Sequence, residues 1–92
     1  MSQEFEWDDA KARRNARRHR VAFDEAATVF SDSQAVVLAD SAHSAKEARY
    51  VILGISAAGR ALVVAFTERG RTIRIITAHR ATRHERQSYE QA

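Results

Sequence analysis

The stretch of this chain with the most reactive side chains runs from Arg71 to Glu85 and reads RTIRIITAHRATRHE. Its first half is rich in isoleucine and threonine, which are typical of a β-strand. Its second half contains Thr82 followed three residues later by Glu85, the spacing of a capping box at the start of a helix. The sequence therefore predicts a strand that leads directly into a helix.

Residues 78–81 are predicted to form a tight corner between that strand and that helix, and they include His79 and Arg80. The first turn of a helix presents free N–H groups and a partial positive charge, which together favour an anion. A guanidinium and an imidazole at the same place suit a phosphate group. A basic, solvent-exposed corner without a ligand explains the same residues equally well, so both interpretations stay open.

The overall composition indicates one folded domain, residues 1–92. Hydrophobic residues make up 45% of the chain and charged residues 29%, an ordinary balance for a globular protein. A chain of this length buries one modest core, which leaves little room for a separate cofactor domain. No apolar run approaches the length that spans a membrane.

The sequence offers no recognisable metal or cofactor site. It has no cysteine, which excludes a disulfide framework and a thiolate metal site. His79 and His84 are five residues apart, about 140° around a helix, and therefore do not share a helical face. There is no HExxH motif and no glycine-rich phosphate loop. An enzyme with this sequence is expected to work without metal or cofactor.

Positive charge is concentrated in two segments. The chain carries 15 Lys and Arg against 12 Asp and Glu, a net charge of +3. Residues 11–20 hold Lys11 and five arginines, and residues 69–86 hold six arginines with Glu85 as the one acidic residue. Arginine suits bidentate phosphate contacts, so a polyanion is a natural partner. An acidic protein surface would satisfy the same charge.

The N-terminal third predicts a short strand and a capped helix. Alternation at residues 4–7 predicts the strand, with Trp7 in the core rather than stacked on a base. Asp8 is placed to cap a helix that ends near His19, with cations crowding its last turns. The candidate buried face of this helix consists of Ala12, Ala16 and His19.

The remaining elements predict an α+β domain. Residues 23–30 carry apolar side chains at i, i+3, i+4 and i+7 and predict a second helix. Three apolar segments predict strands at 35–39, 48–56 and 61–67, before the strand that starts near residue 71. Short turns at 57–60 and 68–71, the second with Gly70 at positive φ, imply antiparallel pairing.

Taken together, four segments resemble the BrnT toxins of bacterial type II toxin–antitoxin systems, in matching order and spacing over nearly the whole chain. The segments are FEWDDAKARRNARRH at 5–19, VAFDEAATVFSD at 21–32, HSAKEARY at 43–50 and RIRIITAHRATRHERQSYE, which ends at 90. The resemblance implies a RelE-like fold: an antiparallel sheet with two N-terminal helices packed on it and a C-terminal helix.

The same resemblance implies a function. It implies a cytoplasmic, metal-independent endoribonuclease toxin that inhibits translation and needs no cofactor or membrane. Its partners would be an RNA substrate and a BrnA-like antitoxin with a ribbon-helix-helix DNA-binding part, joined to the toxin as a hetero-oligomer. DNA would be contacted only through that antitoxin.

Three positions depart from the family pattern. The family usually has glycine where Arg20 stands, serine where Ala22 stands and arginine where His79 stands. The absence of a hydroxyl at 22 removes a helix cap that is ordinarily worth about 0.5–2 kcal/mol. Arg20 must tolerate a backbone conformation that glycine adopts easily. His79 replaces a permanent cation by a titratable one.

Cleavage of RNA without a metal needs a base for the 2′-OH, cations for the phosphorane and an acid for the leaving 5′-oxygen. Arginines are the candidates for the cations, and His79 or Glu68 for the proton transfers. The candidate catalytic residues are Arg74, His79, Arg80 and Glu68, and the candidate RNA-binding residues are Arg69, Arg71, Arg83, Lys11 and Arg14.

Less specific roles remain open for the same residues. Arg74 can form an ion pair with Glu68, and Tyr89 can either assist a base or anchor the last helix. The whole basic face can also belong to a non-catalytic nucleic-acid-binding module, or to a structural protein that docks an acidic partner.

Overall fold

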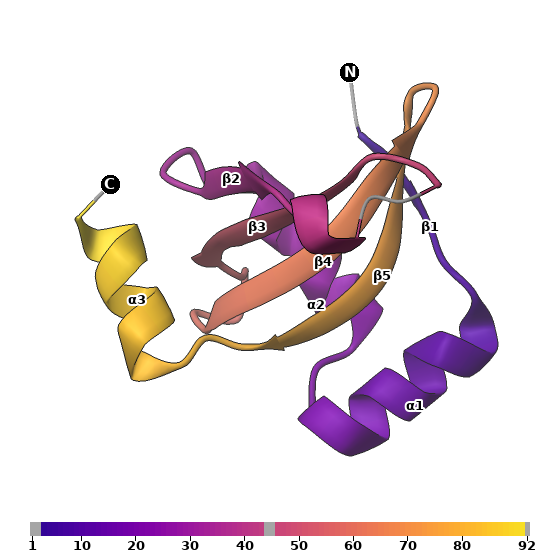
Figure 1. Ribbon diagram of the computed structural model, residues 1–92. Coiled ribbons are helices and arrows are strands. Elements are labelled where there is room, and N and C mark those ends of the chain that lie inside the picture. The colour runs from indigo at the N-terminus through magenta and orange to yellow at the C-terminus, as the bar shows by residue number, and fades with distance from the viewer. Residues whose placement is uncertain (1–2, 44–45, 92) are drawn as a thin grey trace.

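The computed structural model describes residues 3–43 and 46–91, which fold into a five-stranded sheet flanked by helices (Figure 1). In chain order the elements are β1 (Glu4–Glu6), α1 (Asp9–His19), α2 (Phe23–Thr28), a 3₁₀ turn (Val29–Ser31), β2 (Val36–Ala39), a second 3₁₀ turn (Ser41–His43), β3 (Arg49–Ile55), β4 (Ala61–Arg69), β5 (Thr72–Arg80) and α3 (Arg83–Glu90). The predicted α+β class is confirmed. Among these described helices, none is long and apolar enough to cross a membrane.

The sheet has the strand order β1-β5-β4-β3-β2. From β2 to β5 consecutive strands pair antiparallel, and for β3–β4 and β4–β5 this confirms the prediction from the short turns. The first strand differs from the expected all-antiparallel sheet, because β1 pairs parallel to β5. This pairing involves only residues 72–74 of β5. The second half of β5 therefore has no neighbouring strand on that side.

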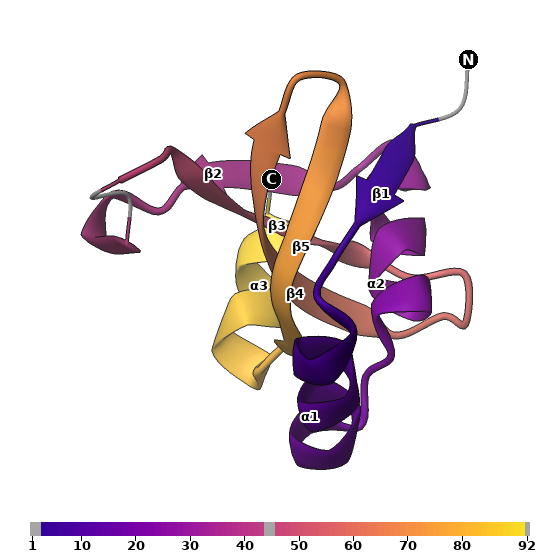
Figure 2. The ribbon, with the colours of Figure 1, turned by 90° about the vertical axis from the view of Figure 1, so that its right-hand side faces the viewer.

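The core lies between the sheet and α2, while α3 lies on the opposite side of the sheet (Figure 2). The predicted stripe of the second helix is largely confirmed, since Phe23 and Ala26 are buried and Phe30 packs against the core. The fully buried Val29 also belongs to the core. The buried apolar residues are Val21, Phe23, Ala26, Val29, Ile52, Leu62, Val64, Phe66, Ile73, Ile75 and Ala78.

A β-bulge in β5 decides which of its side chains face the core. Ala65 pairs with Thr77 and Phe66 with Ile75, so Ile76 is left without a partner. Strict alternation from Ile73 and Ile75 would have pointed Thr77 and His79 into the core. The bulge instead buries Ala78 completely and turns Thr77 and His79 to the other face of the sheet.

The predicted corner at 78–81 is placed wrongly. The β4–β5 ladder continues to Arg80, and the N–H of Ala81 still donates to the carbonyl of Ala61 at 2.8 Å. His79 and Arg80 therefore belong to a strand, and the connection to α3 is limited to the two residues that follow. The helix start itself is confirmed, because Thr82 and Glu85 form both hydrogen bonds of a capping box, at 2.8 and 3.1 Å.

The strand predicted at 35–39 is an outer edge rather than a core strand. It is shortened to Val36–Ala39, and Val37 and Leu38 are 53% and 62% exposed. The apolar residues of β2 pair with β3 on one side, and no strand of the described residues lies on the other side. By contrast, β4 is central, and both of its faces carry apolar side chains.

Arg20 adopts a strained backbone conformation, as expected at a position where the family usually has glycine. It follows α1 with φ 59° and ψ 33°, in the left-handed region, and its N–H closes the helix on the carbonyl of Ala16 at 3.0 Å. A side chain with a Cβ costs about 1–2 kcal/mol in this region. Ala22 begins α2 without any side-chain cap, as expected from its missing hydroxyl.

We expect Arg20→Gly to stabilise the fold by about 1 kcal/mol, which raises Tm by about 4–8 °C in a domain of this size. Arg20→Ala is the matched control, because it removes the same side chain and keeps the Cβ. Urea titrations of the two variants separate these effects. Equal stability of the glycine and alanine variants would show that the backbone at this position is not strained.

Candidate functional site

A cleft of about 570 Å³ lies between α1 and the bulged part of β5. Its walls come from the polar side of α1 and its floor from Ile76 and Thr77. The α1 residues that line it are Lys11, Arg14, Asn15, Arg17, Arg18 and His19. The cleft exists because β1 ends its pairing early and leaves this edge of β5 to a helix.

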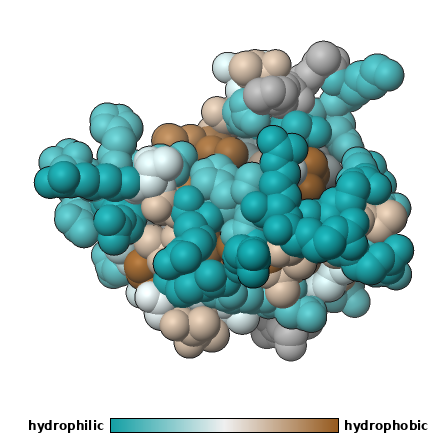
Figure 3. Space-filling view, turned by 90° about the horizontal axis from the view of Figure 1, so that it is seen from below, coloured by the Kyte–Doolittle hydropathy of each residue, from teal (hydrophilic) through white to brown (hydrophobic). Residues whose placement is uncertain are grey.

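The cleft is strongly cationic. Lys11, Arg14, Arg17 and Arg18 all line it, and within the described part of the chain none of them has an ion-pair partner. Seen from below, the surface over α1 and the start of α3 is mostly hydrophilic (Figure 3). Cations gathered along a concave surface raise the local concentration of anions.

His79 lies beside this cleft and meets a second imidazole there. The ring centroids of His79 and His19 are 6.0 Å apart. On its other side, Nε2 of His79 is 3.4 Å from Oε1 of Glu85 in the first turn of α3. The strand, the end of α1 and the start of α3 thus converge on one half-exposed imidazole.

Glu85 is ionised at neutral pH. Burial is the largest single influence and raises the pKa of its carboxyl. Hydrogen bonds from the backbone and hydroxyl of Thr82, together with the His79 imidazole, outweigh burial, so the pKa of Glu85 lies below its ordinary value of 4.5. Its carboxylate can therefore orient the ring of His79.

A buried amide joins α1 to β5. Nδ2 of Asn15 donates to the carbonyl of Ala78 at 2.9 Å and to that of Val21 at 3.0 Å, and Oδ1 accepts from the N–H of Ala78 at 3.1 Å. Asn15 is only 7% exposed. Because Ala78 precedes His79 and Asn15 lies one turn before His19, this amide also fixes the spacing of the two imidazoles.

We expect Asn15→Ala to destabilise the protein by about 3 kcal/mol, because it leaves backbone groups of Ala78 and Val21 buried without partners. Asn15→Asp keeps the acceptor but sets a buried carboxylate oxygen against the carbonyl oxygens of Ala78 and Val21, so its loss should be at least as large at neutral pH. Urea denaturation measures both.

The matched control is Arg13→Ala, an exposed position on the same helix, which should change stability by no more than about 0.5 kcal/mol. An Asn15→Ala variant as stable as this control would mean that the amide does not hold α1 to the sheet.

The structure separates the four predicted catalytic residues. Arg74 lies on the same face of β5 as His79, but its Nη1 donates to Oε2 of Glu6 at 2.5 Å, not to Glu68. Arg80 points to the opposite side of the sheet from His79, toward Glu25. Glu68 is exposed and pairs with Ile73, about 20 Å from His79 along the strand.

The predicted RNA-binding residues fall into two groups. Lys11 and Arg14 line the cleft, and Arg83 begins α3 as an exposed residue. Arg69 and Arg71 lie at the far end of the β4–β5 hairpin, where Arg69 is 3.2 Å from Glu47 and 3.9 Å from Glu6. These two are about 25 Å from His79 at the strand spacing of about 3.3 Å per residue.

Tyr89 anchors the last helix rather than serving the cleft. Its hydroxyl donates to Oδ2 of Asp32 at 2.9 Å. Asp32 also accepts a hydrogen bond from the N–H of Ile55 at 2.8 Å. The hydrogen bonds from Ile55 and Tyr89 lower the pKa of the Asp32 carboxyl. In turn, Asp32 raises the pKa of the Tyr89 hydroxyl. The anchoring interpretation of Tyr89 is the one that the geometry supports.

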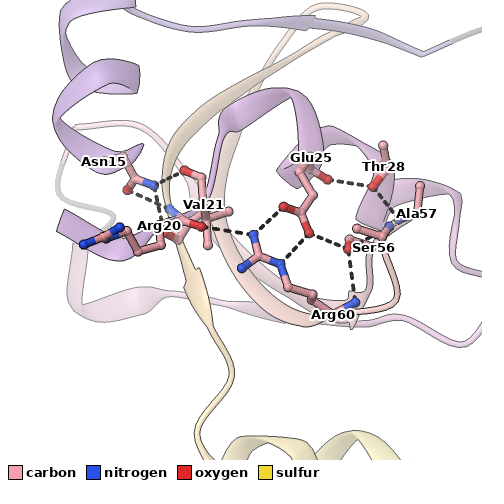
Figure 4. A network of polar contacts seen from close by, with 10 residues as sticks. Asn15, Arg20, Val21, Glu25, Thr28, Ser56, Ala57 and Arg60 are labelled. Carbon is pink, nitrogen blue, oxygen red and sulfur yellow. Dashed lines mark hydrogen bonds and ion pairs between the residues drawn. The ribbon is translucent and has the colours of Figure 1, made fainter. Parts of the chain in front are cut away.

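A second polar network holds α2 to the β3–β4 turn (Figure 4). Nε of Arg60 donates to Glu25 at 2.9 Å, and its Nη2 donates both to Glu25 and to the carbonyl of Arg20, the latter at 3.0 Å. Ser56 adds a hydrogen bond to Glu25 at 2.7 Å. These contacts lower the pKa of Glu25 below its ordinary value of 4.5, and the hydrogen bond from Arg60 has the largest effect.

This network should make stability depend on pH. The folded pKa of Glu25 is below the unfolded one, so the stabilisation is complete above about pH 4.5 and is lost as the pH falls through the folded value. We expect Glu25→Gln to cost about 2 kcal/mol at pH 7 and much less at pH 3. Urea denaturation at both values tests this; a cost independent of pH would contradict it.

Sequence reasoning missed Asn15, His19 and Glu85 as parts of the site. Asn15 interrupts the alanine stripe of α1 and His19 follows it at i+4, so a polar pair on an otherwise apolar face was a usable signal. Glu85 was recognised only as a helix cap. Its second contact, with His79, depends on a strand whose facing is set by the bulge.

Comparisons with known proteins agree with this fold. The family model described as ribonuclease toxin, BrnT, of type II toxin–antitoxin systems matches residues 7–85. The crystal structure of the Brucella abortus ribonuclease toxin BrnT superposes with a TM-score of 0.70, covering 89% of this chain and 100% of that one at 19% sequence identity. At that identity the likeness establishes the fold alone. The search of curated proteins gave no match.

Proposed function

Because this chain belongs to the BrnT family of ribonuclease toxins of type II toxin–antitoxin systems, we propose that it is a metal-independent endoribonuclease that cleaves RNA in the cleft between α1 and β5. The observation that carries this proposal is that cations without an ion-pair partner among the described residues line the cleft, with the imidazole of His79 and the carboxylate of Glu85 beside it. A phosphodiester held there by Lys11 and Arg14 would lie beside His79.

The cations have distinct roles in this proposal. Those of the cleft bind the scissile phosphate and stabilise the charge that develops on it. Arg74 lies on the same face about five residues along the strand from His79, so it is suited to a neighbouring phosphate of the same RNA strand. Arg83 extends the path toward α3. Arg80 faces away and is assigned to the Glu25 network.

Metal independence rests on the donor set. Throughout the described ranges no group of three or more His, Asp or Glu side chains is arranged to hold a metal ion. Arginine and lysine supply the positive charge that a metal provides in other nucleases. The 2′-OH of the substrate is then the nucleophile.

The partner we propose is a ribbon-helix-helix antitoxin that covers the cationic cleft with acidic side chains. A type II system implies a protein antitoxin. The unpaired cations of the cleft supply the charge that such a partner would complement. DNA would be bound through the antitoxin, and the free toxin would act on cytoplasmic RNA.

Expression of the chain alone in a bacterial host should arrest growth and create new RNA 5′ ends, and co-expression of the cognate antitoxin should restore growth. The double variant Lys11→Gln/Arg14→Gln should lose most toxicity, because it removes phosphate-binding charge from the cleft. Growth curves and 5′-end mapping give the readout.

Arg13→Gln/Arg86→Gln is the matched control, since it removes the same charge from exposed positions outside the cleft. Growth arrest without RNA cleavage would favour a non-catalytic nucleic-acid-binding module. Equal loss of toxicity in both double variants would assign the effect to net charge rather than to the cleft.

Cleavage by the purified protein should persist in excess EDTA and should yield a 2′,3′-cyclic phosphate and a 5′-hydroxyl. Both expectations follow from an attack by the neighbouring 2′-OH with no metal involved. Mass spectrometry of the products identifies the ends. Activity that disappears with EDTA and returns with Mg²⁺ would overturn this mechanism.

A further inference from the structure

His79, beside the cleft, is one proton-transfer group, although cleavage through the 2′-OH needs two. Glu68, the other candidate from the sequence, lies about 20 Å away from His79 along the strand. Glu85 is already occupied by the capping box and by Nε2 of His79. A second group must therefore come from another element.

His19 is the side chain in the right place. It is the last residue of α1, it lines the cleft, and its ring centroid is 6.0 Å from that of His79. A group that transfers a proton must come within about 2.6–3.2 Å of the reacting oxygen. Two imidazoles at this spacing can both reach oxygens attached to one phosphorus atom.

The spacing is built into the fold. The amide of Asn15, one turn before His19, is hydrogen-bonded to both backbone groups of Ala78, next to His79. The ring of His79 is oriented by Glu85, which is itself fixed by the backbone of Thr82. The backbones that carry the two imidazoles are therefore held in place relative to each other by a buried amide and a helix cap.

The surroundings of the two rings are mixed in charge. The ionisable groups that line the cleft or contact a ring are Lys11, Arg14, Arg17 and Arg18 from α1 and Glu85 from α3. Arg20 follows His19 directly, Arg83 begins α3, and Arg80 lies on the reverse side of β5. The cations suit the phosphate oxygens that do not react. The carboxylate suits the ring that must accept a proton, by the same logic as in other oriented histidine bases.

We propose that His19 and His79 form an acid–base pair, in which His79 accepts the proton of the 2′-OH and His19 donates a proton to the leaving 5′-oxygen. This inference rests on the proposed ribonuclease function. Because Nε2 of His79 faces Glu85, its Nδ1 is the atom that meets the 2′-OH.

The bonds and protons balance in one step. The 2′-oxygen loses its proton to His79 and forms a bond to phosphorus, while the bond from phosphorus to the 5′-oxygen breaks. The electron pair of that bond stays on the 5′-oxygen, which takes a proton from His19. Exchange of one proton with water at each ring restores the starting state.

The decisive experiment is single-turnover cleavage of two RNA oligonucleotides in EDTA, one natural and one with sulfur in place of the 5′-oxygen at the mapped cleavage site. A thiolate leaves without being protonated, so it needs no general acid. His19→Gln should lose about a hundredfold or more on the natural RNA and regain most of that loss on the sulfur-containing RNA. His79→Gln should lose activity on both.

His84→Gln is the matched control, because it removes an exposed histidine of α3 that does not line the cleft. His19→Ala with added imidazole is the second variant if His19→Gln folds poorly, and imidazole should restore cleavage. The wild-type rate should rise and then fall with pH, and His19→Gln should lose the fall at high pH.

The outcomes separate the two proposals. A wild-type protein that does not cleave RNA overturns the proposed function and the acid–base pair together. Cleavage by the wild type with an unchanged rate in His19→Gln overturns the role of His19 alone. An equal loss on both RNAs would make His19 a positioning residue and would overturn its role as the acid.

Discussion

The structure depends on one side-chain amide that takes the place of a strand. Along the free edge of β5, Asn15 donates to and accepts from the backbone of Ala78, as a neighbouring peptide group would. A primary amide suits this role because it offers a donor and an acceptor side by side. A strand at the same edge would have satisfied the backbone but would have excluded α1. The amide lets a helix with five lysine and arginine side chains, four of them in the cleft, lie against the sheet. The charge of the cleft and the spacing of the two imidazoles both follow from this contact.

Local features were predictable because neighbours in sequence determine them. Asp8 caps α1, the Thr82–Glu85 pair starts α3, and Gly70 takes the positive φ of 60° that its turn requires. The meander from β3 to β5 followed from short turns between apolar segments. The parallel pairing of β1 and the bulge at Ile76 were not predictable in this way, because each depends on a partner strand distant in sequence.

The candidate site was predicted only in part, for the same reason. The sequence grouped His79 with Arg80 because they are adjacent, but adjacent residues of a strand point to opposite faces. It assigned His19 to the buried face of α1 together with Ala12 and Ala16. The structure packs Ala12 against the core and places His19 in the lining of the cleft. The ion pair of Glu25 and Arg60 spans 35 residues and has no local signature. A single sequence does not show which side chains of β5 face the core, because one unpaired residue reverses the alternation along the strand.

The same unpaired residue limits which changes of length the chain can tolerate. Removing one residue from the regular part of β4, such as Val63, would exchange the two faces of the strand beyond the deletion. Removing Ile76 from β5 would not do so, because Ile75 and Ala78 would then lie two positions apart and both would stay in the apolar layer. Other insertions and deletions should be confined to connections such as 57–60, where no facing is at stake. A deletion scan scored for soluble protein would reveal Ile76 as a tolerated position inside an otherwise intolerant strand.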